Sequence, residues 1–391
     1  MGMLLSGIRV VEFGQIVAGP FAGLLLADMG ADVVKVEEPG GGDRMRMWPP
    51  IMRSNGDQGY GANFATLNRN KRSVAVDLRD AVQAKTAADL CLAADLVIEN
   101  FRPGTLARYG LDHQTLRARC PRLIYCSISG YGQQGPLAGR GAFDVTIQGA
   151  SGLMSVTGEK NGPPVKCGIP VADMVAALYA VSTMCAALEG RRRTGKGCYI
   201  DCSMFGSLLG IAALQTSGYF ATGRPPRRLG TAHAHNAPYQ AFRAKDRSFV
   251  VAAGTEKLWR QLCEILDLKE LASDARFDTQ EKRVRNQEVL AEILQKRFAA
   301  EPAVHWLEVL DRYGIPCAPI NDYAEALAEP QVKSLGLLDD LLLPNGLRTR
   351  TVKFPMLVDG APGTVYRQPP ELGEHTQEVI SQWLGQNVEK D

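Results

Sequence analysis

The first third of the chain alternates short apolar runs with longer segments of helical character. The runs are rich in Val, Ile and other β-branched residues, and the intervals between them leave room for a helix. Strands separated in this way form right-handed βαβ units, whose strands pair in parallel. We therefore predict an α/β fold with strands at 8–13, 32–37, 73–78, 94–101 and 122–130.

The pattern changes after the first third of the chain. A long apolar helix is predicted from Asp173 to about Arg191, and a further strand and helix follow it. Prolines, arginines and histidines then interrupt the pattern at 224–242, where we place a domain boundary. The tail contains strand-like residues and one helix that must pack elsewhere. The predicted segments are a large α/β domain at 1–223, a smaller domain at 224–325 and a C-terminal segment at 326–391.

Composition narrows the possible partners and compartment. Among 391 residues, 44 Lys and Arg are balanced by 42 Asp and Glu, so the net charge of +2 does not indicate binding to nucleic acid or an anionic membrane. We find no apolar run of the about 18 residues that a membrane span needs. The nine cysteines include no CxxC pair, which favours a reduced, cytoplasmic location.

One carboxylate, Asp173, has two interpretations. It follows Gly168 and Pro170 and stands at the start of a segment of good helix formers. Aspartate at such a place commonly caps the helix, because its side-chain oxygen accepts a hydrogen bond from a free N–H of the first turn. A carboxylate there is also compatible with chemistry, since the helix N-terminus favours its charged form. The local sequence alone favours the cap.

Other motifs exclude several kinds of site. Gly14, Gly19 and Gly23 follow the first strand but lack the GxGxxG spacing that holds a dinucleotide pyrophosphate. His233 and His235 could present two imidazoles on one face of a strand, but no third ligand stands at a suitable spacing, so we expect no metal ion. Three basic residues precede the third predicted strand and either bind phosphate or form a solvated edge. They are Arg69, Lys71 and Arg72.

Several longer motifs follow one another along the chain. The first is "GIRVVEFGQIVAGPFAGLLLADMGADVVKVEEPGGGD", and "NRNKRSVAVDL", "ENFRPGTLARYGL" and "TGKGCYIDCSM" come after it. "GTAHAHNAPYQAF", "YGIPCAPINDYAEALAEPQV" and "PPELGEHTQEVI" extend the series to the end of the chain. Together these motifs resemble the class III CoA-transferases, a family that includes formyl-CoA transferase, carnitine CoA-transferase and α-methylacyl-CoA racemase. The sequence is most similar to members that move CoA from succinyl-CoA to glutarate, itaconate or mesaconate.

The resemblance implies a covalent role for Asp173. In this family the nucleophile is the aspartate at the place that "PVADMVAALYA" occupies here. Such a carboxylate attacks the donor thioester to give an aspartyl mixed anhydride, and CoA then forms an aspartyl-CoA thioester that the acceptor acid opens. The energy of the thioester is kept throughout. We therefore expect coenzyme A and acyl-CoA as substrates and no permanently bound cofactor.

The resemblance also assigns binding residues. Glu38 departs from the family, whose members often have arginine there, and Phe143 replaces the histidine of the racemase branch. The second departure removes one of two proton carriers, so it disfavours racemisation. The residues carried over as CoA contacts are Leu67, Lys71, Arg72, Asn100, Phe101 and Arg108. The candidates for contact with the acid substrate are Arg46, Arg69, Phe143, His233 and His235.

By the same resemblance, the fold is a Rossmann-like large domain built from both chain ends, with a smaller α+β domain. Two such chains are interlocked in this family, so we expect a homodimer. The implied function is CoA transfer from a donor such as succinyl-CoA to a small dicarboxylate. The alternatives are an acyl-CoA racemase or isomerase, a carnitine-type CoA-transferase and a catalytically silent CoA-binding protein.

Overall fold

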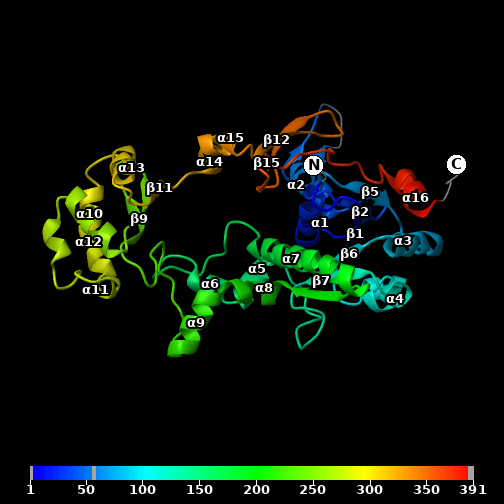
Figure 1. Cartoon of the computed structure of the whole chain (residues 1–391), viewed down its shortest axis with the longest axis horizontal. Coiled ribbons are helices and arrows are strands. Elements are labelled where there is room, and N and C mark those ends of the chain that lie inside the picture. The colour runs from blue at the N-terminus through cyan, green and yellow to red at the C-terminus, as the bar shows by residue number, and fades with distance from the viewer. Residues whose placement is uncertain (1–2, 55–58, 386–391) are drawn as a thin grey trace. The chain divides into compact units, whose positions relative to one another are not determined.

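A computed structural model describes residues 3–54 and 59–385 (Figure 1). The chain divides into two compact units, and each has its own hydrophobic core. The larger unit contains the residues up to Leu153, the segment Lys166–Gly223 and the residues from Pro330 onward, and the smaller unit contains Met154–Val165 and Arg224–Glu329.

The segment Met154–Val165 groups with the smaller unit, whereas the sequence pattern placed it in the large domain. The backbone N–H of Gly230 donates to the Gly158 carbonyl at 3.0 Å. Lys160 forms an ion pair with Glu288, which also lies in the smaller unit. These contacts join residues that are far apart in sequence, so apolar periodicity did not reveal them.

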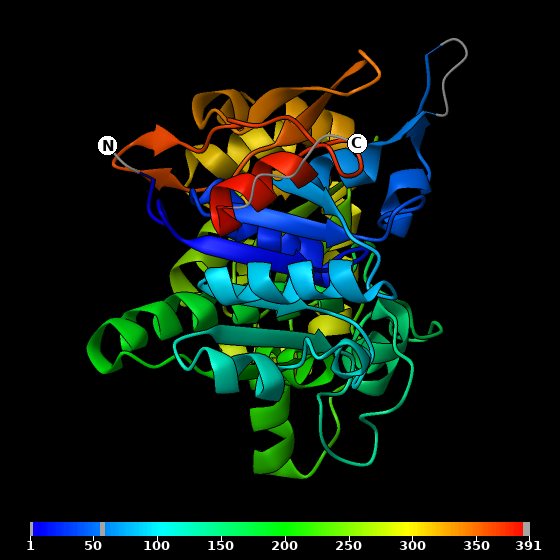
Figure 2. The ribbon, with the colours of Figure 1, turned by 90° about the vertical axis from the view of Figure 1, so that its right-hand side faces the viewer.

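A six-stranded parallel sheet forms the centre of the larger unit, as the βαβ pattern predicts (Figure 2). The strand order is β5-β2-β1-β6-β7-β8, so the order reverses direction at β1. Both faces are apolar, because Val10 and Ile98 belong to one core cluster while Val11 and Val97 belong to another. The strands are β1 (Arg9–Phe13), β2 (Asp32–Glu37), β5 (Arg72–Ala75), β6 (Leu96–Glu99), β7 (Ile124–Ser129) and β8 (Tyr199–Ser203).

Helices cover both faces of this sheet (Figure 2). Helices α1, α5, α7 and α8 pack on one face, and α3, α4 and the last helix pack on the other. Capping fixes where some of them begin: Asp80 accepts the N–H groups of Val82 and Gln83, both at 2.9 Å, at the start of α3. The bounds are α1 (Ala18–Asp28), α2 (Ala62–Asn68), α3 (Ala81–Ala93), α4 (His113–Arg119), α5 (Asp144–Ala150), α7 (Val171–Thr194), α8 (Met204–Ile211) and α9 (Ala213–Thr222).

The C-terminal segment returns to the larger unit. Its helix α16 (Thr376–Leu384) packs on α3 and β5, and it places Val379 and Trp383 in the core on that face. The Trp383 indole N–H donates to Asp32 at 3.0 Å. Short elements complete this unit: β3 (Ile51–Met52), β4 (Tyr60–Gly61), β12 (Leu338–Leu342), β13 (Arg348–Val352), β14 (Leu357–Val358), β15 (Ala361–Pro362) and α15 (Pro330–Ser334).

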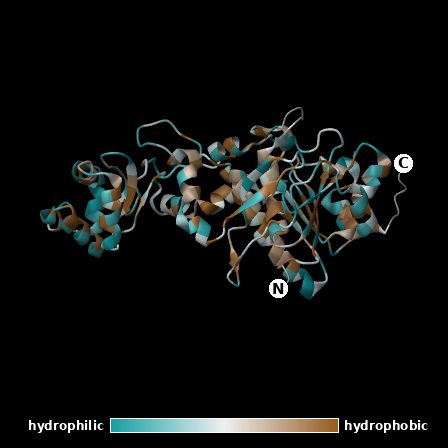
Figure 3. Cartoon of the chain, turned by 90° about the horizontal axis from the view of Figure 1, so that it is seen from above, coloured by the Kyte–Doolittle hydropathy of each residue, from teal (hydrophilic) through white to brown (hydrophobic). Residues whose placement is uncertain are grey.

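The smaller unit is built on a three-stranded antiparallel sheet of order β11-β10-β9. Its core is aromatic: Phe242, Phe249 and Trp306 surround Phe298, with ring centroids 4.9, 5.2 and 5.3 Å away. Its helices carry polar and apolar residues together, teal and brown in Figure 3. The elements are β9 (Tyr239–Arg243), β10 (Ser248–Ala252), β11 (Cys317–Pro319), α10 (Glu256–Ile265), α11 (Gln280–Arg285), α12 (Gln287–Phe298), α13 (Ala303–Arg312) and α14 (Tyr323–Ala328), with α6 (Leu153–Val156) at its border.

In the described part of the chain, α7 alone is long and apolar enough, by length and composition, to cross a membrane. It is longer than the predicted helix and carries Arg191, Arg192 and Arg193 in its last turn. Its residues Ala176 and Met184 are buried in the core cluster on one face of the sheet. The helix is therefore a core element of the larger unit.

The nine cysteines lie in the described part of the chain, and all are free thiols. Two of them, Cys91 and Cys126, are fully buried, and burial raises the pKa of each thiol. They behave as small apolar core residues. The cytoplasmic location stays a prediction.

Candidate active site

Asp173 lies in the first turn of α7, as the third residue of the helix. Pro170 occupies the N-cap position, so the interpretation of Asp173 as the cap is wrong. Among the described residues, no hydrogen bond to the Asp173 carboxylate lowers the pKa of this group. The N-terminus of α7 favours a negative charge at this place. Asp173 is thus a carboxylate that the helix stabilises but that the fold does not use as a cap.

The surroundings of Asp173 make its carboxylate weakly acidic. Burial, with a smaller contribution from the charge of Asp144, raises the pKa of Asp173 to about 7. Carboxyl groups shifted by burial and a like charge are concentrated at functional sites. A carboxylate with little water around it also retains its nucleophilicity. Both properties suit a group that attacks a carbonyl carbon.

Asp144, at the start of α5, holds the N-terminus of α7 in place. Its Oδ1 accepts the Ala172 N–H at 2.8 Å, and its Oδ2 accepts the Gln148 side-chain amide at 2.7 Å. The other end of that amide, Oε1 of the fully buried Gln148, accepts the Cys167 N–H at 2.8 Å. Asp144 therefore acts as a cap supplied by another helix, directly beside Asp173. Sequence reasoning missed Asp144 and Gln148.

A cavity of 290 Å³ lies at the carboxyl ends of β1, β2 and β5 and beside the segment that follows β6. Ligands of open parallel sheets bind at these ends, where the strand order reverses. Phe13, Val36, Phe101 and Tyr109 form apolar parts of its wall. The lining suits a ligand with a flat apolar part.

The loop between β1 and α1 forms one wall of the cavity through Gly14 and Gln15. Asn100 holds this loop: its Oδ1 accepts the Gln15 N–H at 2.8 Å, and its Nδ2 donates to the Gln15 carbonyl at 2.9 Å. A Cβ at Gly14 would lie 2.9 Å from the carbonyl carbon of Gly19, so this tight loop needs glycine. Asn100, predicted as a CoA contact, thus supports the cavity wall.

A buried ionic network lies against the same loop. Lys35 is fully buried, and its ammonium pairs with Glu12 at 2.9 Å and with Asp43 at 3.0 Å. It also donates to the Gly14 carbonyl at 2.6 Å, and Asp43 accepts the Ile16 N–H at 3.1 Å. Burial works against the charge of Lys35, but the surrounding carboxylates outweigh it and raise the pKa of Lys35. The network therefore fixes the loop from inside the fold.

Two of the predicted CoA contacts are cations used inside the fold. The fully buried Lys71 pairs with Glu12 at 2.7 Å and donates to the Pro20 carbonyl at 2.7 Å. Burial, only partly opposed by Glu12, lowers the pKa of Lys71 to about 8. Arg72 is 3% exposed, and its Nε donates to Asp32 at 2.9 Å. These contacts do not fit a direct bond from either cation to a phosphate.

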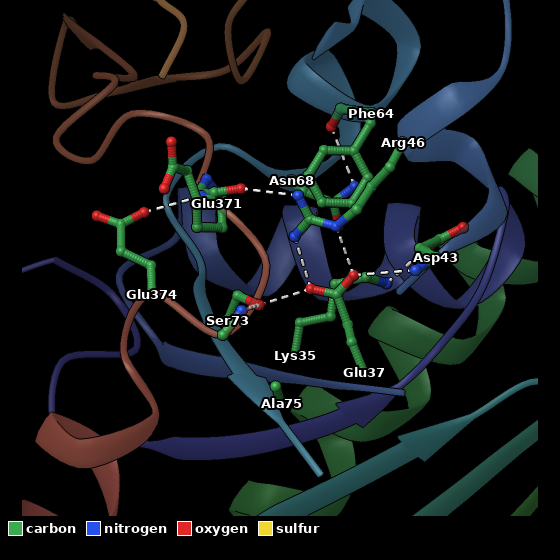
Figure 4. A network of polar contacts seen from close by, with 12 residues as sticks. Lys35, Glu37, Asp43, Arg46, Phe64, Asn68, Ser73, Ala75, Glu371 and Glu374 are labelled. Carbon is green, nitrogen blue, oxygen red and sulfur yellow. Dashed lines mark hydrogen bonds and ion pairs between the residues drawn. The ribbon is translucent and has the colours of Figure 1, made fainter. Parts of the chain in front are cut away.

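Two cations that were predicted to anchor the acid substrate also form ion pairs inside the fold. Arg46 donates to Glu37 from Nη2 at 2.7 Å and from Nε at 2.8 Å, and it lies over the Phe64 ring (Figure 4). The Ser73 hydroxyl donates to the same carboxylate at 2.6 Å. Arg69 is buried and pairs with Asp28 at 2.6 Å. Both guanidinium groups are therefore parts of the scaffold in this structure.

The other predicted CoA contacts have different environments. Phe101 lines the cavity, where its ring forms part of the apolar wall. Leu67 is buried in a core cluster with Phe64, so it supports the fold from behind. Arg108 is exposed in the short 3₁₀ turn η2 (Leu106–Tyr109), next to the lining residues Leu106 and Tyr109.

The remaining predicted substrate residues lie in both units. Phe143 is 70% exposed and directly precedes Asp144. His233 and His235 lie in the smaller unit, where the His235 N–H donates to Nδ1 of His233 at 3.0 Å. Within residues 3–54 and 59–385, no three His, Cys, Asp or Glu side chains are grouped so that they could hold a metal ion.

Comparison with known proteins gives one consistent result. A sequence model of CoA-transferase family III matches residues 5–376. The chain is 40% identical over 380 residues to succinate–glutarate CoA-transferase of Agrobacterium fabrum. The matched region covers 97% of this chain and 95% of that protein. It is 37% identical over 388 residues to succinyl-CoA:glutarate CoA-transferase of Homo sapiens, with coverage of 97% and 86%.

A solved structure agrees with this result. A CAIB/BAIF family protein from Brucella suis superposes with a TM-score of 0.87 at 39% identity, covering 98% of this chain and 100% of that one. The superposed part covers nearly the whole chain and therefore includes residues of both units. The chain therefore belongs to CoA-transferase family III and is an enzyme of that class.

Proposed function

We propose that this enzyme transfers CoA from succinyl-CoA to a small dicarboxylate, with Asp173 as the group that carries the intermediates. One observation supports the role of Asp173 above all. It is a half-buried carboxylate with a pKa raised to about 7, at a helix N-terminus that Asp144 caps in its place. A carboxylate so placed is available for reaction with a carbonyl carbon.

In the proposed first half-reaction, an Asp173 oxygen attacks the thioester carbonyl of succinyl-CoA. The carbon–sulfur bond breaks, CoA leaves as the thiolate, and an aspartyl–succinyl mixed anhydride remains. The thiolate then attacks the aspartyl carbonyl, which releases succinate and leaves Asp173 as a thioester of CoA. No proton is transferred in either step, so the chemistry needs exclusion of water more than it needs an acid or a base.

The second half-reaction reverses these steps with the acceptor acid. The acceptor carboxylate attacks the aspartyl carbonyl of the thioester and displaces the CoA thiolate, which gives a second mixed anhydride. The thiolate attacks the acyl carbon of the acceptor, and Asp173 leaves as a free carboxylate. Each tetrahedral intermediate carries an oxyanion, which the positive end of the α7 dipole can stabilise.

The cavity at the strand ends is our candidate site for the nucleotide part of CoA. Its position at the reversal of the strand order and its apolar walls of Phe13, Phe101 and Tyr109 support this assignment. We infer that Asn100, Lys35 and Lys71 act through the loop that forms the cavity wall. They are positioning residues for CoA.

The dicarboxylate specificity is proposed from the relatives, which are named for succinate and glutarate. With succinyl-CoA as donor, we expect new thioesters of glutarate, itaconate and mesaconate, separable by liquid chromatography and identified by mass. Acceptors that differ by one methylene should differ in kcat/KM by about 10-fold to 200-fold. Carnitine and oxalate serve as the other arms of the panel.

Two outcomes of the panel would contradict the proposal. A thioester of carnitine alone would indicate a carnitine-type transferase. Deuterium entering the α-carbon of a branched acyl-CoA, without any new thioester, would indicate a racemase or isomerase. The exposed phenyl ring of Phe143 argues against the second outcome, since it carries no proton for exchange.

We propose a homodimer as the functional form. Helices α7, α8 and α9 of the larger unit expose large apolar side chains, and α9 projects away from the sheet (Figure 2). Large exposed apolar patches mark protein–protein interfaces. These side chains are Leu178, Tyr179, Leu209, Ile211, Leu214, Tyr219 and Phe220.

Sedimentation equilibrium tests the dimer directly. The expected mass is twice the 42.4 kDa of the chain, at all protein concentrations in the micromolar range. An interlocked arrangement predicts that the mass does not fall on dilution before the protein unfolds. A mass equal to one chain would contradict the proposal.

A further inference from the structure

Another cavity lies within the smaller unit. It has a volume of 550 Å³ and lies between the loop after α6, the loop before β9 and the turn between α11 and α12. Its lining in the described part of the chain includes four cations, Lys160, Arg227, Arg228 and Arg285, and one carboxylate, Glu288. A concave site with this excess of positive charge attracts anions. The partners of the four cations therefore decide whether the cavity is free to bind one.

Two of these cations have no anionic partner in the fold. Among the residues that the structure describes, neither Arg227 nor Arg228 has an ion pair or a side-chain hydrogen bond. Nε of Arg228 is buried and still lacks an acceptor. The side chain runs past Gly158, where an added Cβ would lie 3.4 Å from Cδ of Arg228. A buried donor without an acceptor costs free energy, so an anion in this cavity would supply what the fold lacks.

The other two cations have partners that they can exchange. Lys160 pairs with Glu288, and Nη2 of Arg285 pairs with Glu281 at 2.9 Å. All four side chains are about half exposed or more. Ion pairs between such side chains contribute little stability, because water and salt screen them. Both cations can therefore turn to a bound anion at small cost.

The start of α12 adds backbone donors to the same cavity. Asn286 holds the N-cap position of this helix without capping it, because its Nδ2 donates to the carbonyls of Arg276 and Lys282, both at 3.0 Å. The first three residues of the helix, 287–289, line the cavity. The N–H groups of a first turn have no carbonyl partner within the helix, and the helix dipole favours an anion beside them. The cations and the helix end thus select the same kind of ligand.

We propose that this cavity binds a polyphosphate group, either free or as part of a nucleotide. A phosphate has several acceptor oxygens and binds the fork of a guanidinium in a bidentate way. A chain of phosphates carries enough charge to engage the four cations and the helix end together, whereas a single carboxylate would leave most of them without a partner. In the bound form Arg228 donates to the phosphates, and Glu288 releases Lys160.

The site is separate from the proposed chemistry of CoA transfer. Asp173 and the residues that line the strand-end cavity belong to the larger unit, while every residue that lines this second cavity belongs to the smaller one. Binding of a polyphosphate group therefore goes beyond the proposed function and is measured without turnover.

The test is isothermal titration calorimetry of the full chain with inorganic triphosphate, in the absence of divalent cations. The wild type should bind it with a Kd that rises with salt concentration. For R228Q we expect a Kd about tenfold higher or more, as for loss of a charge-assisted bidentate contact. For E288Q, which removes the competing carboxylate, we expect a Kd about twofold to fivefold lower.

ATP and citrate are the other two probes. A Kd for ATP equal to that for triphosphate would assign the site to the polyphosphate group alone, and a lower one that R228Q raises would add the nucleoside to the ligand. Either result supports the site. Citrate carries carboxylates in place of phosphates and should bind more weakly than triphosphate.

Arg312 provides a matched control. It is an exposed arginine of the smaller unit, as Arg227 is, but it lies at the end of α13 and does not line the cavity. R312Q should bind triphosphate as the wild type does. R227Q is the second variant, should R228Q fail to fold: an exposed side chain without an ion pair can be replaced with no change in melting temperature, and we expect a Kd about threefold to tenfold higher.

Several results would overturn the site. They are no binding of triphosphate by the wild type, a Kd that neither R228Q nor R227Q changes, an equal loss in R312Q, and tighter binding of citrate than of triphosphate. A matching loss of CoA binding in R228Q would also overturn it, because the cavity would then belong to the CoA site. If triphosphate binds as expected but the wild type transfers CoA to no acid, the proposed function fails and this site stands.

Discussion

Replacing Asp173 with Asn or Ala is expected to lower kcat for CoA transfer by about 10³-fold or more, because the reaction loses the oxygen that attacks the thioester. The Kd for CoA should change little, since the proposed nucleotide site lies at the strand ends. The measurement is the steady-state rate with succinyl-CoA and glutarate, together with CoA binding. Full turnover by D173A would contradict the proposed mechanism.

Covalent labelling gives a second readout for the same variant. Wild-type enzyme quenched in acid during turnover and then digested should contain a peptide spanning Asp173 with the added mass of a succinyl group or of CoA. The corresponding peptide of D173N should carry neither. A labelled peptide elsewhere in the chain would place the nucleophile at another residue.

The stability of D173N separates a catalytic defect from misfolding. The pKa of Asp173 is raised from its ordinary value to about 7, so the folded protein binds the proton more tightly than the unfolded chain does. The wild type therefore loses stability from this group as the pH rises through the range between the two values and stays at its minimum above pH 7. Asn carries no charge, so D173N should be more stable than the wild type at pH 8 and equal to it near pH 4.

Asp144 provides the matched variant for the pH dependence. In the wild type, kcat/KM should rise about tenfold per pH unit below pH 7 and level off above it, as Asp173 ionises. D144N removes the like charge that helps to raise the pKa of Asp173, so the rising limb should move to lower pH. Asn can still accept the Ala172 N–H, which Asp144 accepts at 2.8 Å. A limb that does not move would show that another group controls the profile.

The second large effect is expected at Lys35. K35M should lower the free energy of unfolding by about 3–5 kcal/mol, because it leaves Asp43 buried without its cation and Glu12 with Lys71 as its remaining cation. It also removes the donor to the Gly14 carbonyl, so the surviving folded protein should bind CoA less tightly. Urea unfolding and CoA titration of the same preparation measure both effects.

Lys85 is the control for Lys35. Its ion pair with Asp89 measures 2.6 Å, shorter than either pair of Lys35, but the Lys85 side chain is 74% exposed. K85M should therefore change the free energy of unfolding by less than about 1 kcal/mol. If K85M and K35M were equally destabilising, burial would not be the origin of the effect.

The parallel sheet could be predicted from the sequence because its strands are buried on both faces. Such strands are continuous apolar runs, as in Val10 and Val11 of β1, and helices of sufficient length separate them. The segment Met154–Val165 could not be placed in this way. Its contacts are a backbone hydrogen bond and an ion pair to distant residues, and neither leaves a periodic signal.

The site was only partly accessible to the same reasoning. The resemblance to the family pointed to Asp173, although its local sequence favoured a cap. The resemblance assigned Lys71 and Arg72 as CoA contacts, and the structure places both in internal ion pairs. A basic run in the sequence gives no sign of such burial. Asp144 was missed because its role depends on the Ala172 N–H that it accepts from another helix. The local signal for Asp144 was its position directly after Phe143.

The return of the C-terminal segment sets an order of events during translation. The apolar face over α3 and β5 stays open until α16 has left the ribosome, since Val379 and Trp383 cover it. By then the whole of the smaller unit has been synthesised and can already have closed around its aromatic core. A nascent chain stalled just before α16 would therefore have a folded smaller unit and a larger unit whose apolar face is exposed. This is the form that a chaperone would recognise.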